Sequence, residues 1–346
     1  MEERKRFTYA GAGVDVEASN TTKQRMKALI RSTFGPEVVT DIGGFGGLFA
    51  PRWEAYDDPV LVSSVDSVGT KLKVAFMMGR HDTVGIDIVN HCVNDILVQG
   101  AEPLFFMDYI GMGTHQQEVV LQIIEGLAVA CRRAGCALLG GEMATLPDFY
   151  RPREYDLAGT IVGIVGRKQI VDGASIEAGD VLLGLASDGL HTNGYSLARK
   201  LVFEAAGLEI EDRVEELGCT VGEELLRPHR SYLSSIRALL EVVDVHGMAH
   251  ITGGGMVDNI PRVLPDGLSV EIQKDAWRIP PIFTWLQRLG DVEGQEMFHT
   301  FNMGIGMAVI VPEREVEVSR TLLERHGERV HVIGRVICGG KGVRFV

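Results

Sequence analysis

The first half of the chain alternates between short stretches rich in β-branched residues and longer segments with apolar residues at every third or fourth position. Residues 59–66 (PVLVSSVD) are short and rich in valine, which is typical of a strand. Residues 82–103 show helical spacing, and we expect this helix to stop at Gly100. By the same criteria we predict strands at 102–113, 136–142 and 155–166 and a helix at 117–135.

A polar, glycine-containing stretch at residues 167–180 has little apolar periodicity, and we place a domain boundary there. The expected domains are residues 1–167 and residues 168–346. In the second domain we predict strands at 180–187, 268–273, 304–312 and 330–337 and helices at 195–207, 281–289 and 315–326. This alternation favours an α+β or α/β fold, with a mixed sheet and flanking helices in the second domain.

Composition narrows the class of protein. A formal net charge of -13 without a local basic patch argues against a nucleic-acid partner. The five cysteines have no CxxC spacing, so we expect reduced thiols rather than disulfides or a zinc site of that type. The charged amino terminus lacks an apolar signal region, and no run approaches the roughly 18 apolar residues of a membrane span. We therefore expect a cytoplasmic protein with no membrane partner.

The segment DIGGFGGLFA at residues 41–50 is unusually rich in glycine. It is not a phosphate-binding P-loop, because Leu48 and Phe49 follow where that motif requires lysine and serine or threonine. Two interpretations remain open: a surface loop, or a lid whose backbone amides close on nucleotide phosphates. The lid would consist of Gly43, Gly44, Phe45, Gly46 and Gly47.

Acidic residues occur at the ends of several predicted elements. Asp66 ends a strand, Asp95 follows Asn94 on the apolar helix, and Asp108 and Glu142 lie in or after further strands. Any one of them could be a salt bridge or a helix cap. As a set they favour a hard-cation site for magnesium and triphosphate, with Lys71 nearby.

Two turns in the second domain have the composition of anion-binding helix starts. In DGLHTNGYS, His191 and Asn193 precede a helix; in TGGGMVDN, Thr252 precedes Gly253, Gly254 and Gly255. The alternative in each case is an ordinary helix cap. Together they suggest a phosphorylated substrate in addition to a nucleotide.

Eight segments, in this order, resemble the phosphoribosylformylglycinamidine cyclo-ligase family. The most specific are CVNDILVQGAEPLFF and TGGGMVDNIPRVLP, and the resemblance spans essentially the whole chain. The acidic turns alone are shared with wider relatives such as selenophosphate synthetase and thiamine-monophosphate kinase. The eight segments are YAGAGVD, GGFGGL, DSVGTKL, RHDTVGIDIVNHCVNDILVQGAEPLFFMDY, GGE, GLHTNGYSL, HITGGGMVDNIPRVLP and TFNMGIGM.

The resemblance implies an ATP-dependent ring closure in purine biosynthesis, in which formylglycinamidine ribonucleotide becomes aminoimidazole ribonucleotide. It also implies a homodimer whose first-domain sheets pair into a closed β-barrel. The implied site residues fall into three sets. Asp66, Asp95 and Glu142 would bind magnesium; Asp95, His191 and Lys71 would be catalytic; and ATP or substrate phosphate would be held by Gly43, Gly44, Phe45, Gly46, Gly47, Asn94, Asp108, Asn193, Thr252, Gly253, Gly254 and Gly255.

The match has departures near the implied cation site. Where the family commonly reads Glu-Thr-Ala-Glu-Met-Pro-Gly, this chain has EMATLPD, so that Thr145 replaces an acidic residue and Asp148 a glycine; Ser67 also replaces a common glycine. Two other functions therefore stay open. One is a paralogous ATP-dependent enzyme acting on a different amide or phosphate acceptor, and the other is a silent nucleotide-binding subunit.

Overall fold

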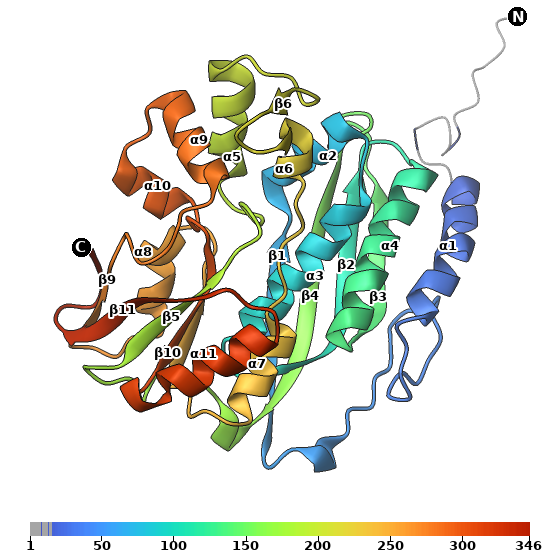
Figure 1. Cartoon of the computed structure of the whole chain (residues 1–346). Helices are drawn as coiled ribbons and strands as arrows, with labels where there is room; N and C mark the ends of the chain where they lie inside the picture. Colours follow the sequence, from blue (N-terminus) through green and yellow to red (C-terminus); the bar gives the residue numbers. More distant parts are fainter. Residues whose placement is uncertain (1–7, 9–12, 14–15) are drawn as a thin grey trace, which may run out of the picture.

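The chain folds as two domains of mixed α+β structure that lie side by side (Figure 1). The structure, a computed structural model, describes residues 8, 13 and 16–346. The motif at residues 9–15 therefore lies, except for Gly13, outside the described residues. The segment between the two main sheets, residues 167–180, contains one short 3-10 helix, Arg167–Gln169.

The first domain is built on a four-stranded sheet in the order β1-β4-β2-β3. β2 and β3 are parallel and the other pairs are antiparallel. All four predicted strands are confirmed, and β3 runs three residues beyond its predicted end. The strands are β1 Pro59–Ser67, β2 Glu102–Met112, β3 Ala137–Thr145 and β4 Tyr155–Gly166.

Helices cover one face of this sheet (Figure 1). α3, Asp82–Leu97, is buried nearly all round because the sheet packs on one side of it and α7, Leu233–Leu240, of the second domain packs on another. α4, Gln117–Ala134, lies beside α3 and ends at Gly135, whose left-handed conformation suits glycine. Both helices confirm the sequence prediction. α1, Val16–Arg31, and α2, Leu72–Met78, were not predicted.

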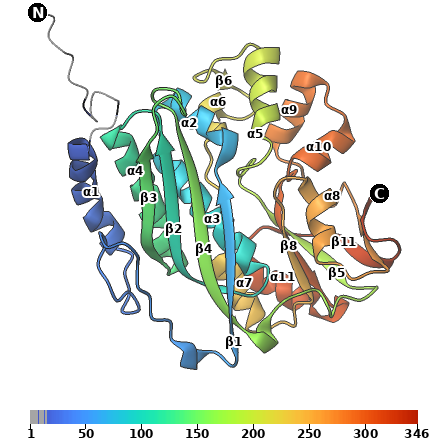
Figure 2. The same cartoon turned by 180° about the vertical axis from the view of Figure 1, so that it is seen from behind.

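None of the described helices lies on the opposite face of the first sheet (Figure 2). Residues of β1 and β2 that point away from α3 leave large apolar side chains in contact with solvent. Leu61 is 54% exposed, Val65 68% and Met107 38%. A sheet face of this kind is normally covered by another layer.

The second domain contains a six-stranded mixed sheet in the order β12-β9-β11-β5-β10-β8. β12 is parallel to β9 and the remaining pairs are antiparallel. Every residue of the neighbouring strands β5 and β10 is buried, so the core of the domain lies there. The four predicted strands are confirmed, whereas β8 and β12 were missed. The strands are β5 Val181–Ala186, β8 Gly247–His250, β9 Leu268–Ile272, β10 Ile305–Val311, β11 Val330–Cys338 and β12 Val343–Phe345.

Short helices flank the second sheet, as predicted (Figure 1). The segments predicted as helices at 195–207, 281–289 and 315–326 form α5 with a following π-helical turn, α9 and α11. No described helix has both the length and the apolar composition that a membrane crossing requires. The helices are α5 Tyr195–Arg199, α6 Val221–Leu225, α8 Gly255–Asn259, α9 Pro281–Gly290, α10 Gly294–Thr300 and α11 Val316–Arg325, and a hairpin of β6 Arg213–Val214 and β7 Cys219–Thr220 precedes α6.

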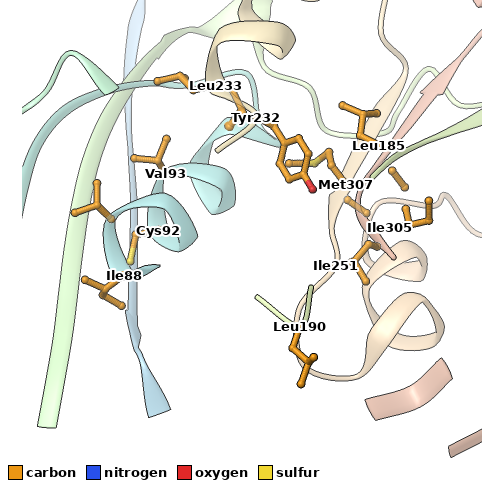
Figure 3. Close-up of a cluster of buried hydrophobic side chains, with 14 of the residues drawn as sticks. Ile88, Cys92, Val93, Leu185, Leu190, Tyr232, Leu233, Ile251, Ile305 and Met307 are labelled. Carbon is orange, nitrogen blue, oxygen red and sulfur yellow. The ribbon is translucent and has the colours of Figure 1, made fainter. Parts of the chain in front are cut away.

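Tyr232 connects the two domains at the centre of the molecule. Figure 3 shows its ring between the apolar side chains of α3 and those of the second sheet, among them Val93 and Met307. Its hydroxyl donates to the carbonyl of Ala186 at 2.9 Å, and its backbone N–H donates to the side chain of Asn94 at 3.1 Å. The apolar core is therefore continuous across the domain boundary, which holds the side chains on either side in fixed positions.

Candidate active site

Two carboxylates of the first domain meet where α3 crosses β1. His91 and Asp95 are four residues apart on α3 and so share one face of the helix. Ser64 and Asp66 are two residues apart on β1, so their side chains share one face of the strand, and both point toward that face of α3. His91 Nε2 lies 2.9 Å from Asp66 Oδ2 and 3.7 Å from Asp95 Oδ2, and the Ser64 hydroxyl donates to Asp95 Oδ2 at 3.0 Å.

The second domain adds imidazoles to this place. His250 is the last residue of β8, and its Nδ1 lies 2.8 Å from Asp95 Oδ1. Its other nitrogen, Nε2, lies 3.0 Å from Nε2 of His229. His229 Nδ1 and His91 Nδ1 both contact the Thr192 hydroxyl, at 3.2 and 2.7 Å. A continuous chain of hydrogen bonds thus runs from Asp95 through three imidazoles and one hydroxyl to Asp66.

The electrostatics of this chain follow from burial and from the neighbouring charges. Burial alone would raise the pKa values of Asp66 and Asp95, but hydrogen bonds from His91 and His250 leave both lowered. Burial would lower the pKa of His91, but the two carboxylates leave it raised. The pKa of His229 falls well below its usual value because the ring is buried among other cationic groups. The carboxylates are therefore ionised near neutral pH, and His91 is the imidazole of this chain whose protonated form its surroundings favour.

A cavity of about 490 Å³ opens onto these groups between the domains. It is lined by Asp66, His91, Asp95 and His250, and by Thr252 of the predicted glycine turn, among others. The cavity therefore joins the acidic residues predicted in the first domain to one of the anion-binding turns predicted in the second.

The two predicted anion-binding turns adjoin each other. A Cβ built on Gly253 would lie 3.3 Å from Asn193 Oδ1, and the Asn193 amide nitrogen is buried without a hydrogen-bond partner. Asn259 ties the glycine turn together by donating to the carbonyls of Gly253 and Gly255, at 3.1 and 2.8 Å. Asn193 therefore has a free donor close to a rigid turn.

The expected role of Lys71 in neutralising phosphate is corrected by the structure. Its ammonium group is fully buried and uses all three donors: Asp87 at 2.9 Å and the carbonyls of His191 and Arg227 at 3.0 and 2.7 Å. Because no donor remains, Lys71 cannot hold a phosphate in this arrangement. It instead joins the first domain to two segments of the second.

His191 and Asn94 are likewise corrected from ligand contacts to internal positions. The His191 ring has no exposed surface, and its Nε2 accepts from the backbone N–H of Asp188 at 3.1 Å. Burial lowers its pKa well below the usual value, so the ring is neutral. The Asn94 amide is also buried, and it donates to the carbonyl of Arg230 at 2.8 Å and accepts from the Tyr232 backbone. Both residues position backbone segments.

Asp108 and Glu142, the other predicted acidic residues, lie at a second site on the first sheet. Asp66, Gly159 and Asp108 occupy one row across the first sheet, so Asp66 and Asp108 are two strand spacings apart, roughly 10 Å. Glu142 lies on β3, at the opposite edge of the sheet from β1. Burial, together with the charge of Glu142, raises the pKa of Asp108 to about 7. The structure thus brings Asp66 and Asp95 together but places Glu142 beside Asp108.

Asp108 and Glu142 line a cavity of about 700 Å³ together with the glycine-rich loop. Lys23 and Lys27 of α1 lie in the same lining. The loop is loosely packed at Gly43, where a Cβ would meet no neighbouring atom within 4 Å, and this glycine has a φ of +114°. At Gly47, by contrast, a Cβ would come within 2.4 Å of Leu139, so this glycine allows the loop to approach β3. Phe45 is fully exposed at the tip.

Five residues of these two sites were not identified from the sequence: His91, His229, His250, Lys23 and Lys27. His91 could have been found, since it precedes Asp95 by one turn of a predicted helix. Lys23 and Lys27 have the same spacing, but their helix was not predicted. Nothing in the local pattern indicates that residues 229 and 250 meet, because that contact depends on tertiary packing.

Comparison with known proteins gives a consistent pattern. The profile of the AIR synthase related protein N-terminal domain matches residues 52–165, and that of its C-terminal domain matches residues 177–346. A phosphoribosylformylglycinamidine cyclo-ligase of Alkaliphilus oremlandii is 52% identical over 338 residues, which are 98% of this chain and 99% of that protein. Escherichia coli HypE, a hydrogenase maturation protein, has the same fold, with a TM-score of 0.68, 21% identity and 93% of each chain covered. HypE in complex with ATP gives a TM-score of 0.65 at 18% identity, with 93% of this chain and 90% of that chain covered.

Proposed function

The chain belongs to the phosphoribosylformylglycinamidine cyclo-ligase family, and on that premise we propose that it closes the imidazole ring of aminoimidazole ribonucleotide at the expense of ATP. The observation that carries the site assignment is the cavity between the domains, where two carboxylates, two histidines and the Thr252 turn face one space. Membership of a purine-biosynthesis family also supports a cytoplasmic location as part of this proposal.

The reaction must overcome the poor electrophilicity of an amide. The amide oxygen of formylglycinamidine ribonucleotide attacks the γ-phosphorus of ATP, and ADP leaves. The amidine nitrogen of the same molecule then attacks the activated carbon, loses its proton and expels the oxygen as phosphate. Since the nucleophile and the electrophile belong to one molecule, a bound and folded substrate gains the high effective concentration of an intramolecular step.

The glycine-rich loop is the proposed nucleotide lid. Its cavity combines open glycine amides with Lys23 and Lys27, whose ammonium groups suit phosphate oxygens. The likeness to HypE, a protein solved with ATP, supports a nucleotide site on this fold. Asp108 and Glu142 offer only oxygen donors, and that donor chemistry fits magnesium. A magnesium ion there would neutralise phosphate charge. Asp66 and Asp95, by contrast, share their cavity with the imidazoles of His91 and His250, so the donors there include nitrogen as well as oxygen.

The cavity between the domains is the proposed site of the ribonucleotide. Asn193, with its unpartnered amide nitrogen, and the turn from Thr252 to Gly255 would hold the substrate phosphate. Asp95 and His250, joined at 2.8 Å, would accept the proton that the amidine nitrogen releases. The partners of His250 then allow that proton to pass along the hydrogen-bonded chain away from the reacting carbon.

The departure at EMATLPD does not by itself favour another substrate. Asp148 has a φ of +70°, the left-handed conformation that glycine adopts most easily and aspartate tolerates. Thr145 is the last residue of β3. Neither residue is among the described residues that line the two cavities. The replacements are therefore compatible with a turn of unchanged shape.

We further propose a homodimer in which a second copy covers the bare face of the first sheet. Leu61, Val65 and Met107 leave an apolar surface there that the described part of one chain does not cover. Pairing of two such sheets into a closed barrel would also remove their exposed edges. Light scattering on the purified chain should give the mass of two chains. The mass of one chain at assay concentration would contradict this arrangement.

The proposed function is tested by incubating the purified chain with ATP, magnesium and formylglycinamidine ribonucleotide. ADP and aminoimidazole ribonucleotide should form in equal amounts. ATP turnover that ignores this substrate but responds to another amide or phosphate acceptor would assign the chain to a paralogous reaction. Binding of ATP with no turnover under any condition would leave only a silent nucleotide-binding subunit.

A further inference from the structure

We propose that Arg262 recognises the 5′-phosphate of the ribonucleotide and so makes the cavity between the domains specific for a phosphorylated substrate. The inference rests on the proposed function, because the ribonucleotide is the substrate proposed there, and it adds a specificity residue to that site. The recognition itself requires only that the folded chain binds a ribose 5-phosphate group in this cavity.

Arg262 is the only lysine or arginine among the described residues that line this cavity. The other ionisable groups of the lining are three carboxylates and two imidazoles, and the imidazoles already contact Asp66 and Asp95. A phosphate monoester carries a charge of about −1.5 to −2 near neutral pH. When it enters a cavity it gives up water, so its charge must be compensated by the walls. Arg262 is the side chain of this lining that can do so.

The guanidinium group of Arg262 is available for a ligand. The residue is exposed, and its side chain forms no ion pair or hydrogen bond with any residue that the structure describes. Asp172, the carboxylate of the second domain in the same lining, instead accepts from the backbone N–H of Ala174 at 2.9 Å. The planar guanidinium presents parallel N–H donors that match two oxygens of a phosphate. A phosphate would therefore gain this contact without displacing an internal partner.

The backbone that carries Arg262 is held firmly. Arg262 ends the short 3-10 helix Ile260–Arg262, and the side chain of Ile260 is fully buried. The segment between the domains packs on the next residue: a Cβ built on Gly173, which has a φ of +82°, would lie 2.0 Å from the carbonyl oxygen of Val263. Glycine allows this close approach. The base of the arginine is therefore fixed at the cavity wall, while its exposed end remains free to meet a ligand.

Arg262 lies beside the turn that begins at Thr252. Asn259 precedes Arg262 by three residues, so their Cβ atoms are roughly 5–6 Å apart on one side of the helical segment. Both residues line the cavity, as does Thr252. The Thr252 hydroxyl donates to Asn259 Oδ1 at 3.2 Å, which places the turn next to the same side of the segment. A phosphate held by the turn would therefore have the guanidinium of Arg262 as its neighbouring cation.

This contact should affect substrate binding rather than the chemical step. The 5′-phosphate is not the group that reacts, so its contact with Arg262 is the same before and during ring closure. An interaction of that kind changes KM and leaves kcat unaltered. A charged hydrogen bond to phosphate should change the affinity by at least about tenfold.

The experiment measures the dissociation constants of ribose 5-phosphate and of ribose for the full-length chain by ligand-observed NMR, without ATP. The wild-type chain should bind ribose 5-phosphate at least about tenfold more tightly than ribose. Arg262→Gln should lose this preference by weakening the binding of ribose 5-phosphate alone. Arg262→Lys, which keeps the charge but not the paired donors, should fall between the two.

The matched control is Arg278→Gln. Arg278 is also an exposed arginine of the second domain, but it does not line this cavity, so its variant should bind ribose 5-phosphate as the wild type does. Thermal unfolding midpoints of the Arg262 variants should equal that of the wild type, because no described side-chain contact is lost. In the ring-closure assay, Arg262→Gln should raise the KM for the ribonucleotide at least about tenfold and leave kcat and the KM for ATP unchanged.

Equal affinity of the wild-type chain for ribose and ribose 5-phosphate would overturn the assignment of Arg262, and so would wild-type affinity for ribose 5-phosphate in Arg262→Gln. Neither result bears on the ring closure, which is measured with ATP, magnesium and the ribonucleotide. Conversely, a chain that binds ribose 5-phosphate through Arg262 but forms no aminoimidazole ribonucleotide would sink the proposed function and leave the phosphate contact standing.

Discussion

Lys71 and Asp87 form a fully buried ion pair in the first domain, with 2.9 Å between the ammonium nitrogen and the carboxylate. The same ammonium donates to the carbonyls of His191 and Arg227 in the second domain. Asp87 in turn accepts from the backbone N–H of His229 at 2.7 Å. This pair therefore fixes the segments that carry His191 and His229 relative to α3.

The variant Lys71→Met should be strongly destabilised. Removing one partner of a buried pair leaves the other charge without compensation, which costs about 3–5 kcal/mol. Denaturant unfolding of Lys71→Met and of Lys168→Met, whose ammonium is exposed and paired with Asp57, measures the difference. Equal stability of the two variants would mean that the pair does not hold the domains. Because Lys71 does not contact phosphate, any Lys71→Met that remains folded should bind ATP normally.

The variant Asp95→Asn should keep the fold and lose turnover. The carboxylate accepts from His250 and from the Ser64 hydroxyl, and an amide cannot serve both as acceptor. Loss of the proton acceptor should lower kcat by at least about a hundredfold. Asp58→Asn, at an exposed pair with Arg167, is the matched control and should behave as wild type. Wild-type kcat in Asp95→Asn would remove this carboxylate from the mechanism.

Much of the fold could be predicted because local pattern and tertiary environment agree. β1 and β4 have the β-branched composition of strands, and α3 keeps its apolar spacing until it ends before Gly100. Strand β8 was missed because four residues are too short for a period to show. That omission also concealed His250, the residue through which the second domain reaches Asp95.

The variants Lys23→Ala and Lys27→Ala should weaken ATP binding. Both lysines line the cavity of the glycine-rich loop, and a hydrogen bond to a charged group contributes about 1.5–3 kcal/mol. Each variant should raise the KM for ATP about tenfold and leave the KM for the ribonucleotide unchanged. Lys200→Ala, at an exposed position in the second domain, is the control. A tenfold effect on the ribonucleotide alone would exchange the assignments of the two cavities.

Asp108 should make stability depend on pH. Its pKa is raised to about 7 in the folded chain, against about 3.9 when unfolded, so the folded state binds more protons between these values. Stability from this group therefore falls as pH rises from 4 to 7 and stays low above 7. In chelator-treated protein, Asp108→Asn should raise the unfolding midpoint at pH 8 and leave it unchanged at pH 4. Equal shifts at both pH values would contradict the raised pKa.

The site was harder to predict than the fold because its residues converge only through packing. Asp66 and Asp95 were identified as acids at the ends of regular elements, but Glu142 has the same appearance in sequence and lies across the sheet. Lys71, in an exposed-looking GTK turn, is buried and paired with Asp87 of α3. Residues that meet only through tertiary contacts leave no periodic pattern in the sequence. The sequence therefore indicates which residue types take part, but not which of the two cavities each residue lines.

The most direct test of the account follows the amide oxygen of the substrate. Formylglycinamidine ribonucleotide labelled with ¹⁸O at the formyl amide is incubated with ATP, magnesium and the purified chain, and the released phosphate is analysed by mass spectrometry. Activation of that oxygen by phosphorylation predicts one ¹⁸O atom in each phosphate formed with aminoimidazole ribonucleotide. Unlabelled phosphate accompanying ring closure, with the label released to water, would contradict the account.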